Sequence, residues 1–356
     1  MTTTPKILID AGRSQRGWSR VGQFLTCPQK FAYDQRLGLA LIPSDPLVRG
    51  SMGHVLQAHQ HAIWGCQQGG CWVDDQWHTD PDAFLSPEDA MYAWCDQNQD
   101  GYDHADRMLE TFRRYMAKHP EAPGRILAVE YPITAVLGMR LNRAAPGQNW
   151  GLWVIDPAEV PRLNDPDIDI DKPLKGFHGD PIHVTPLDCP GHRDHNRPVF
   201  MSRRLDLAVG DSTDRAWIWD HKHQAYVKTG SSTDAYSVDG GFAAFRIMGQ
   251  QVWDGRDGRK RFGGLTLNLI QTQEPWRVAR PNVPPTPHRD GHFAALLWRA
   301  EHEIARLDAS GLNLWTWPKM MNESQCMGRY GACAGLDLCR YGEAAVTDDM
   351  LRNTDD

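Results

Sequence analysis

Two short runs, each within a brief apolar stretch and separated by a turn-rich segment, constrain the fold of this chain more than any other feature. The runs are Arg204-Leu205-Asp206 and Trp219-Asp220-His221-Lys222, and Gly210 to Asp214 lies between them. Gly, Asp, Ser and Thr are typical turn residues, so the pattern predicts a β-hairpin. Residues two apart on a strand share a face, so Asp220 and Lys222 point the same way, and the hairpin places Asp206 beside them.

Two carboxylates and an ammonium group on one sheet edge suit the hydrolysis of phosphodiesters with a divalent metal. Asp206 and Asp220 would hold Mg²⁺ or Mn²⁺, and Lys222 would orient or activate a water beside the scissile phosphate. An Asp-x-Lys at a strand end is by itself more often a surface pair. The interpretation therefore depends on the residues that accompany it.

Composition bounds the compartment and the partners. A chain of 356 residues with 41% hydrophobic residues can build one large domain or two modest ones. No apolar run approaches the length of a membrane span, and Met1 to Asp10 contains no long apolar stretch. We therefore expect a cytoplasmic protein that does not bind membranes. The net charge of −7 argues against nonspecific coating of nucleic acid but leaves a local basic groove open.

Eight cysteines in a cytoplasmic chain indicate metal binding or reactive thiols rather than disulfides. Cys27 stands near the start, and Cys326, Cys333 and Cys339 crowd near the end with six and five residues between them. Such thiolates bind Zn²⁺ or an iron–sulfur cluster. The spacing is poor for a zinc finger, and buried inert cysteines are the simpler alternative.

Helical and strand patterns are mixed along the chain, so the fold class is α/β or α+β. We predict helices over 19–33 (interrupted at Cys27-Pro28), 51–64, 86–118, 233–254 and 288–310, and strands over 126–133, 201–209, 216–222 and 263–272. The predicted divisions are an N-terminal helical region over 1–125, a core over 126–272, a C-terminal helix and cysteine-rich segment over 273–346, and an acidic tail over 347–356. Residues 65–85 and 275–287 look like loops. The segment at about 140–200 is too long for an ordinary connection, and we interpret it as an insertion in the core.

Three further residues are candidates for the same chemistry. His54 follows small residues on its predicted helix, which would let the helix approach a metal site. Glu130 lies inside an apolar strand, where a carboxylate needs a partner or a metal. Gln250 lies on a helix after the hairpin and could hydrogen-bond the lysine or a phosphate. A structural or surface role is the simpler alternative for His54 and Glu130.

A second group of possible metal ligands lies in the presumed insertion. Cys189, His192 and His195 stand close together in the sequence. They could form a metal hook, but an ordinary polar loop is the preferred interpretation.

Taken in order, these residues resemble the PD-(D/E)XK nucleases of the RecB-like type. The resemblance is to the CRISPR-associated exonucleases that carry a four-cysteine [4Fe–4S] cluster, and to related phage proteins. The matching positions, from an N-terminal signature to a terminal cysteine triplet, are Ser19, Phe24, Cys27, Pro28, Lys30, Phe31, Tyr33, Gly50, His54, Arg204, Asp206, Asp220, Lys222, Gln250, Cys326, Cys333 and Cys339.

The resemblance implies a restriction-endonuclease-like core with a mixed central sheet flanked by helices. It also implies that a [4Fe–4S] cluster on Cys27, Cys326, Cys333 and Cys339 clamps the N- and C-terminal segments together. The activity it implies is that of a divalent-metal-dependent DNA exonuclease acting on single-stranded ends in a bacterial or phage-infected cell.

The same resemblance implies a role for each site residue. His54, Asp206 and Asp220 would bind the metal, Lys222 would position the attacking water, and Gln250 would orient Lys222 or the phosphate. Glu130 is a weaker candidate behind the ligands. DNA is the expected partner, with a homo-oligomer or a recombination or CRISPR-type protein as further possibilities.

Two alternative functions stay open. Arg203 and His223 stand where the family pattern usually has a glycine and a hydroxyl residue. The tyrosine expected a few residues after Gln250 is absent, and Trp253 is the nearest aromatic. These departures motivate a non-catalytic nucleic-acid-binding or adaptor protein on a nuclease scaffold. The other alternative is a zinc-stabilised protein unrelated to nucleases.

Overall fold

The structure is a computed structural model of the chain. It describes residues 8, 16–39, 45–141, 148–227, 236–237, 239–254, 261–319, 326–328, 331–333, 335–347 and 350. None of the helices in this described part combines the length and the apolar character needed to cross a membrane.

Two compact units are each assembled from separate stretches of the chain. Unit 1 comprises 1–12, 44–134 and 202–291, and unit 2 comprises 13–43, 135–201 and 292–356. Both units therefore combine segments that lie far apart in the sequence. The predicted segment boundaries follow the order of the chain and stay a prediction.

Unit 1 is built on a mixed β-sheet in the strand order β10-β9-β8-β7-β3-β1-β2, with β11 also pairing with β9. β7 and β8 are antiparallel, β8 and β9 are parallel, and β1 runs parallel to β3 and antiparallel to β2. The strands are β1 (Cys71–Val73), β2 (Gln76–His78), β3 (Arg125–Leu141), β7 (Phe200–Gly210), β8 (Arg215–Gln224), β9 (Arg261–Gln271), β10 (Val278–Ala279) and β11 (Asn282–Val283).

Helices cover both faces of this sheet. The ring of His61 on α3 (Asp45–Gln67) stacks on His221 of β8 with ring centroids 5.1 Å apart, whereas Gly249 of α8 (Gly240–Trp253) lies against Ile218 of the same strand. Side chains alternate along a strand, so positions 218 and 221 face opposite sides, and α3 and α8 lie on opposite faces.

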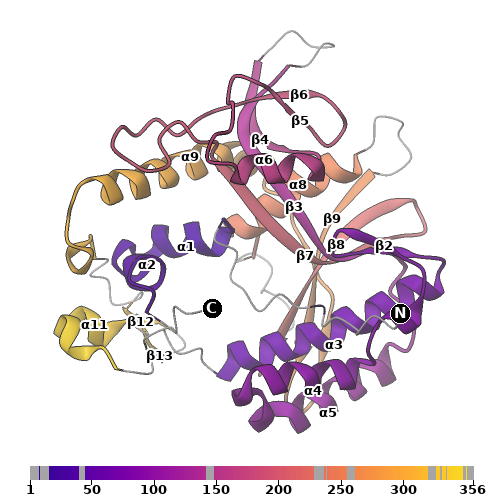
Figure 1. The fold of residues 1–356 in the computed structure, drawn as a ribbon. Coiled ribbons are helices and arrows are strands. Elements are labelled where there is room, and N and C mark those ends of the chain that lie inside the picture. Colours follow the sequence, from indigo (N-terminus) through magenta and orange to yellow (C-terminus); the bar gives the residue numbers. More distant parts are fainter. Residues whose placement is uncertain are drawn as a thin grey trace. The chain divides into compact units, whose positions relative to one another are not determined.

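The helix α3 is buried on two sides. Its Ala58 and Ala62 pack with Val73 and Leu207 of the sheet, and its Met52 packs with two further helices. Those helices are α4 (Pro87–Gln97) and α5 (Ala105–Lys118), which lie beside α3 in Figure 1. A helix buried on both sides holds its side chains in fixed positions, which matters for His54.

Unit 2 joins a small sheet to helices from both ends of the chain. β3 continues into it and pairs antiparallel with β4 (Gln148–Val154) and β6 (Pro181–Val184), and β6 pairs with β5 (Leu174–Lys175). The helices are α1 (Trp18–Thr26), α2 (Pro28–Gln35), α6 (Val160–Asn164), α9 (Pro287–Ala309) and α11 (Leu336–Tyr341), and a two-stranded ribbon is formed by β12 (Met327–Gly328) and β13 (Gly331–Ala332). An ion pair between Arg20 of α1 and Glu301 of α9 ties the early and late helices together.

The predicted fold class is confirmed at the level of a mixed α/β protein whose central mixed sheet is flanked by helices. The hairpin strands, the interruption at Cys27-Pro28 and the helix over 288–310 agree with β7, β8, α1, α2 and α9 within a few residues. The PD-(D/E)XK assignment itself stays a prediction.

Three predicted segments need correction. The presumed loop over 65–85 contains β1 and β2, and the loop over 275–287 contains β10 and β11. The helix over 86–118 is divided by a 3₁₀ turn at Gln99–His104. The segment over 140–200 contains strands, and its Ile155 and Leu163 share a core with Val136 of β3. Its interpretation as an insertion stays a prediction.

The helix expected from 233 begins in the structure at Gly240. Asp239 caps it and accepts hydrogen bonds from the backbone N–H groups of Gly241 and Phe242. Residues 233–235 and most of the acidic tail lie outside the described residues.

Candidate metal centre

The carboxylate of Asp206 lies where the two strands of the predicted hairpin stop pairing. The register runs from Gly210↔Ala216 to Leu207↔Trp219. Next to it, the backbone N–H of His221 donates to Oδ2 of Asp206 over 2.7 Å. The Asp206 side chain thus takes up a ladder hydrogen bond, which fixes the carboxylate at this end of the hairpin.

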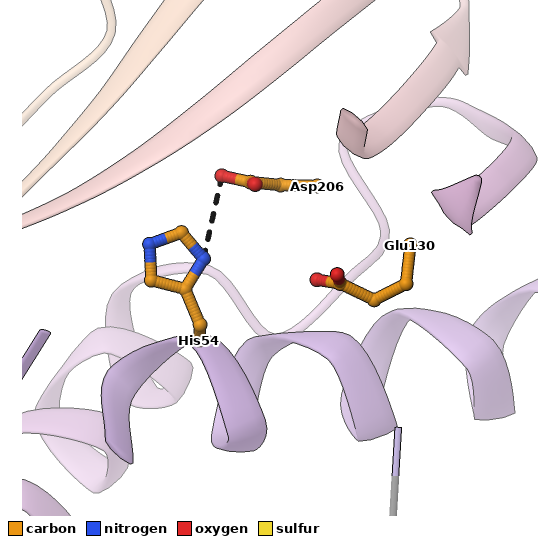
Figure 2. A group of neighbouring side chains, drawn as sticks. All are labelled: His54, Glu130 and Asp206. Carbon is orange, nitrogen blue, oxygen red and sulfur yellow. Dashed lines mark ion pairs between the residues drawn. The ribbon is translucent and has the colours of Figure 1, made fainter. Parts of the chain in front are cut away.

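Three potential metal ligands converge here from three elements. Ligand atoms of His54 on α3, Glu130 on β3 and Asp206 on β7 all lie within 4.8 Å of one another. Figure 2 shows the three side chains pointing toward one another, with Nδ1 of His54 3.4 Å from Oδ2 of Asp206. A single small cation contacts its ligands at about 2.1 Å, so a site of this size can hold one after small side-chain movements.

Glu130 holds its place in this group with a strained backbone. Its φ is +48°, in the left-handed region that residues with a side chain rarely adopt, and only 7% of the residue is exposed. Such conformations cost about 1–3 kcal/mol and cluster at functional sites. Glu130 therefore belongs with His54 and Asp206, although the sequence ranked it as a weaker candidate. The signal that could have raised its rank is its acidic side chain in the apolar run Ile126 to Ile133.

Asp220 and Lys222 lie beside these three residues and form an ion pair of 2.5 Å. Burial lowers the pKa of Lys222, but the charges of Asp220 and Asp206 more than offset this, so its pKa is raised overall. Lys222 is consequently a cation at neutral pH. It can hold a water or an anionic oxygen, but it is a poor general base.

Burial and several neighbouring charges act on the pKa of the Asp206 carboxyl group. Burial raises its pKa, His54 lowers it, Asp220 raises it and Lys222 lowers it, and the net direction is upward. Neighbouring carboxylates in a partly buried site repel one another when they are all ionised, and a bound divalent cation offsets this repulsion. One imidazole and two carboxylates form a mixed nitrogen and oxygen donor set, which suits Mn²⁺ better than Mg²⁺.

Buried histidines support the group from behind. Nδ1 of His221 lies 2.9 Å from Nδ2 of Asn268, and His61 stacks on His221. Burial lowers the pKa of His61 and that of His223 to about 3, so both rings are neutral at physiological pH. A Cβ atom on Gly53 would lie 2.3 Å from the ring of His223. His223 therefore packs against α3 at Gly53.

Gln250 is not brought to this group. Its side chain is exposed on α8, and its neighbour Gly249 packs against Ile218, which lies four residues before Lys222 on β8. Within the described part of the chain, no side-chain hydrogen bond joins Gln250 to Lys222, and its orienting role stays a prediction. Periodicity identified the helix correctly but could not show which end of it approaches Lys222. Arg203 instead faces α8, with its guanidinium 4.2 Å from the ring centroid of Phe245.

The four cysteines of the predicted cluster gather within unit 2. Cys27 joins α1 to α2, and Cys326 and Cys333 flank the β12–β13 ribbon with a backbone hydrogen bond of 2.7 Å between them. The hydroxyl of Tyr33 donates to Sγ of Cys339 over 3.7 Å. Burial and the nearby Cys339, Cys27 and Cys333 together raise the pKa of Tyr33.

The cysteine sulfurs do not gather as closely as the three ligand atoms of the metal centre. Among the residues that the structure describes, no three of these sulfurs lie within 4.8 Å of one another. Zn–S bonds of about 2.3 Å place the sulfurs of a tetrahedral site about 3.8 Å apart. A multi-iron cluster separates its thiolates further because iron and sulfide atoms lie between them.

The residues Cys189, His192 and His195 form a hydrogen-bonded loop. Nδ1 of His192 accepts from the backbone N–H of Asp194, and its Nε2 lies 3.3 Å from Asp308. Nδ1 of His195 accepts from the backbone N–H of Cys189. Because both ring nitrogens of His192 are engaged, the polar-loop interpretation fits better than a metal hook.

Comparison with protein-family models and with curated proteins finds no match for this chain.

Proposed function

We propose that this protein is a divalent-metal-dependent DNA nuclease that acts on single-stranded ends as an exonuclease. The observation that supports this most is the convergence of His54, Glu130 and Asp206 beside the Asp220–Lys222 pair. This revises the predicted ligand set in two ways. Glu130 joins His54 and Asp206 as a ligand, and Asp220 pairs with Lys222 instead. The order of motifs in the sequence supports the nuclease assignment independently.

Each residue then has a distinct task. His54, Glu130 and Asp206 would hold the cation, with Mn²⁺ favoured over Mg²⁺, and the cation would supply Lewis-acid activation of water and phosphate. The Lys222 ammonium orients the attacking water and neutralises charge that develops on the phosphate oxygens. Asp220 holds Lys222 in place and in its charged form.

The test is metal-dependent cleavage of end-labelled DNA by purified Lys222→Ala and Asp206→Asn proteins. Both variants are expected to lose at least about a hundredfold in cleavage rate while the circular dichroism spectrum is retained. Exposed Lys118→Ala, on α5, is a control that should keep wild-type cleavage. Undiminished cleavage by either site variant would contradict the proposal.

The gathered cysteines support a second element of the proposal, a [4Fe–4S] cluster that stabilises unit 2. Cys27 and Cys339 would close a loop of almost the whole chain, so the cluster would have a structural role. The Tyr33 hydroxyl, which donates to Cys339, would then hydrogen-bond a ligating sulfur. The alternative of a zinc site predicts a colourless protein without iron.

A non-catalytic adaptor on a nuclease scaffold is the second candidate function, and the exposed position of Gln250 favours it. A nuclease of this type would be expected to place a polar side chain next to Lys222, and no hydrogen bond joins Gln250 to Lys222 among the described residues. Titration with a labelled single strand in the presence of Mn²⁺ separates the two functions. Binding without any product would support the adaptor.

A further inference from the structure

A short aromatic ribbon forms the edge of the sheet in unit 1. β2 pairs with β1, and its Trp77 lies opposite Trp72 of β1. Trp72 and Trp77 are 44% and 50% exposed, and Trp72 also approaches Tyr131 of β3 with ring centroids 6.2 Å apart. We call Trp72, Trp77 and Tyr131 the aromatic platform.

The platform is held in a defined position. The two tryptophan rings meet edge to face, with centroids 5.8 Å apart at 72°. Trp77 lies over Gly70, where a Cβ atom would be 2.6 Å from its ring and where φ is +121°. A glycine is thus required under the ring of Trp77. Exposed tryptophans that are held in one position in this way are typical of a binding surface.

The tip of the ribbon is attached to both strands that carry the carboxylates of the metal centre. The backbone N–H of Asp74 donates to the carbonyl of Val129, the residue before Glu130. The carboxylate of Asp74 pairs with Arg204 over 3.2 Å, two residues before Asp206 on β7. Tyr131 directly follows Glu130. The aromatic platform therefore begins within a residue or two of the candidate ligands.

We propose that the aromatic platform stacks the unpaired bases of a nucleic-acid strand whose backbone enters the metal centre. This inference rests on the proposed function and names the part of the substrate that this surface recognises. Aromatic side chains bind single strands through base faces that are available only when the bases are unpaired. The ion pair with Arg204 neutralises the charge of Asp74 at the tip of the ribbon. This reduces the repulsion between Asp74 and a phosphate bound next to the metal centre.

The experiment compares two substrates in the wild type, Trp72→Ala/Trp77→Ala and a control, Tyr92→Ala. Tyr92 is a 40% exposed aromatic on α4, away from the ribbon. One substrate is a single-stranded oligonucleotide, and the other is a small p-nitrophenyl phosphodiester that has no base. We expect the ratio of kcat/KM for the oligonucleotide to kcat/KM for the small ester to fall at least about tenfold in the double variant and to stay at the wild-type value in Tyr92→Ala.

Binding to the same oligonucleotide in EDTA provides a second readout. The dissociation constant should rise about as much as the kinetic ratio falls, and its salt dependence should keep the wild-type slope because stacking releases no counterions. Quenching of tryptophan fluorescence should accompany binding in the wild type.

Each contrary outcome is distinguishable. An unchanged ratio in the double variant, with active wild type, would overturn the platform and leave the nuclease proposal standing. An equal loss on both substrates would mean that the tryptophans support the metal centre itself. A wild-type dimer that the double variant abolishes would mean that a second copy of the chain covers this edge. A wild type that neither binds nor cleaves DNA would overturn both proposals.

Discussion

At the scale of single residues, Glu130 is unusual both in its side chain and in its backbone. It is acidic and buried, and its backbone occupies the left-handed region at φ +48°. A glycine would adopt this conformation without strain, and the chain nevertheless places a carboxylate here. The strained backbone therefore lowers the stability of the fold and directs a carboxylate oxygen of Glu130 toward His54 and Asp206.

Replacing Glu130 by glycine should separate stability from metal binding. Relief of backbone strain and of carboxylate crowding should raise the metal-free free energy of unfolding by about 1 kcal/mol. Mn²⁺ should stabilise the variant far less than the wild type, because the cation loses a ligand. Urea denaturation with and without Mn²⁺ measures both quantities.

Glu130→Gln is the matched variant for this measurement, because it removes the charge and keeps the strain. It should lose the stabilisation by Mn²⁺ without reaching the metal-free stability of Glu130→Gly. Equal stabilisation of Glu130→Gly and the wild type by Mn²⁺ would remove Glu130 from the ligand set.

At the scale of elements, the approach of α3 to β8 sets the position of His54. Gly53 allows the helix to lie directly against the ring of His223, since a Cβ atom would be 2.3 Å from that ring. Gly50 lies one turn earlier on the same helix and has nothing within 4 Å of such a Cβ atom. The two glycines therefore look alike in the sequence but differ in what surrounds them.

Alanine at these two positions should have opposite effects. Gly53→Ala must displace His223 or the helix, and we expect a loss of about 1–3 kcal/mol in stability together with weaker Mn²⁺ binding. Gly50→Ala should be neutral or stabilising by up to about 1 kcal/mol, since alanine favours a helix interior. Thermal unfolding and a Mn²⁺ titration of both variants test this pair. Equal behaviour would mean that α3 does not pack on β8 in this way.

At the scale of the whole molecule, each unit depends on segments from distant parts of the chain. Unit 2 draws Cys27 from the first helices and Cys326, Cys333 and Cys339 from the last residues. A cofactor bound by all four would link those segments directly. Loss of the cofactor should consequently lower the stability of the whole of unit 2.

Removal of a cluster cysteine should therefore release the ends of the chain. Protein purified anaerobically is expected to be brown and to contain about four iron atoms per chain. Cys339→Ala should lose the iron and the visible absorption and become sensitive to limited proteolysis within 16–39 and 326–347. Cys189→Ala is the control, because that cysteine belongs to the polar loop of unit 2. Full iron content in Cys339→Ala, or zinc in place of iron, would contradict the cluster.

Much of the secondary structure was predictable because it depends on local patterns. The hairpin, α1, α2 and α9 follow from apolar periodicity, proline and turn residues, and these act over a few neighbouring positions. The errors fall where local signals are weak. β1 and β2 are three residues each, and the strands of 140–200 are short and embedded among proline, glycine and aspartate. Such strands are stabilised by partners elsewhere in the chain, which local patterns do not reveal.

By itself, the sequence determined which chemical groups are available and the order in which they occur. It offered His54, Asp206, Asp220, Lys222 and the four cysteines as candidates. It placed Asp220 beside Lys222 because alternation along a strand is a local property. Only the tertiary structure decided that Glu130 lies beside His54 and Asp206. It also decided that Trp72 and Trp77 form an exposed ribbon, which Asp74 joins to β3 and β7. These relations depend on which strands pair and which face each helix covers, and such long-range contacts are set by packing of the whole unit rather than by neighbouring residues.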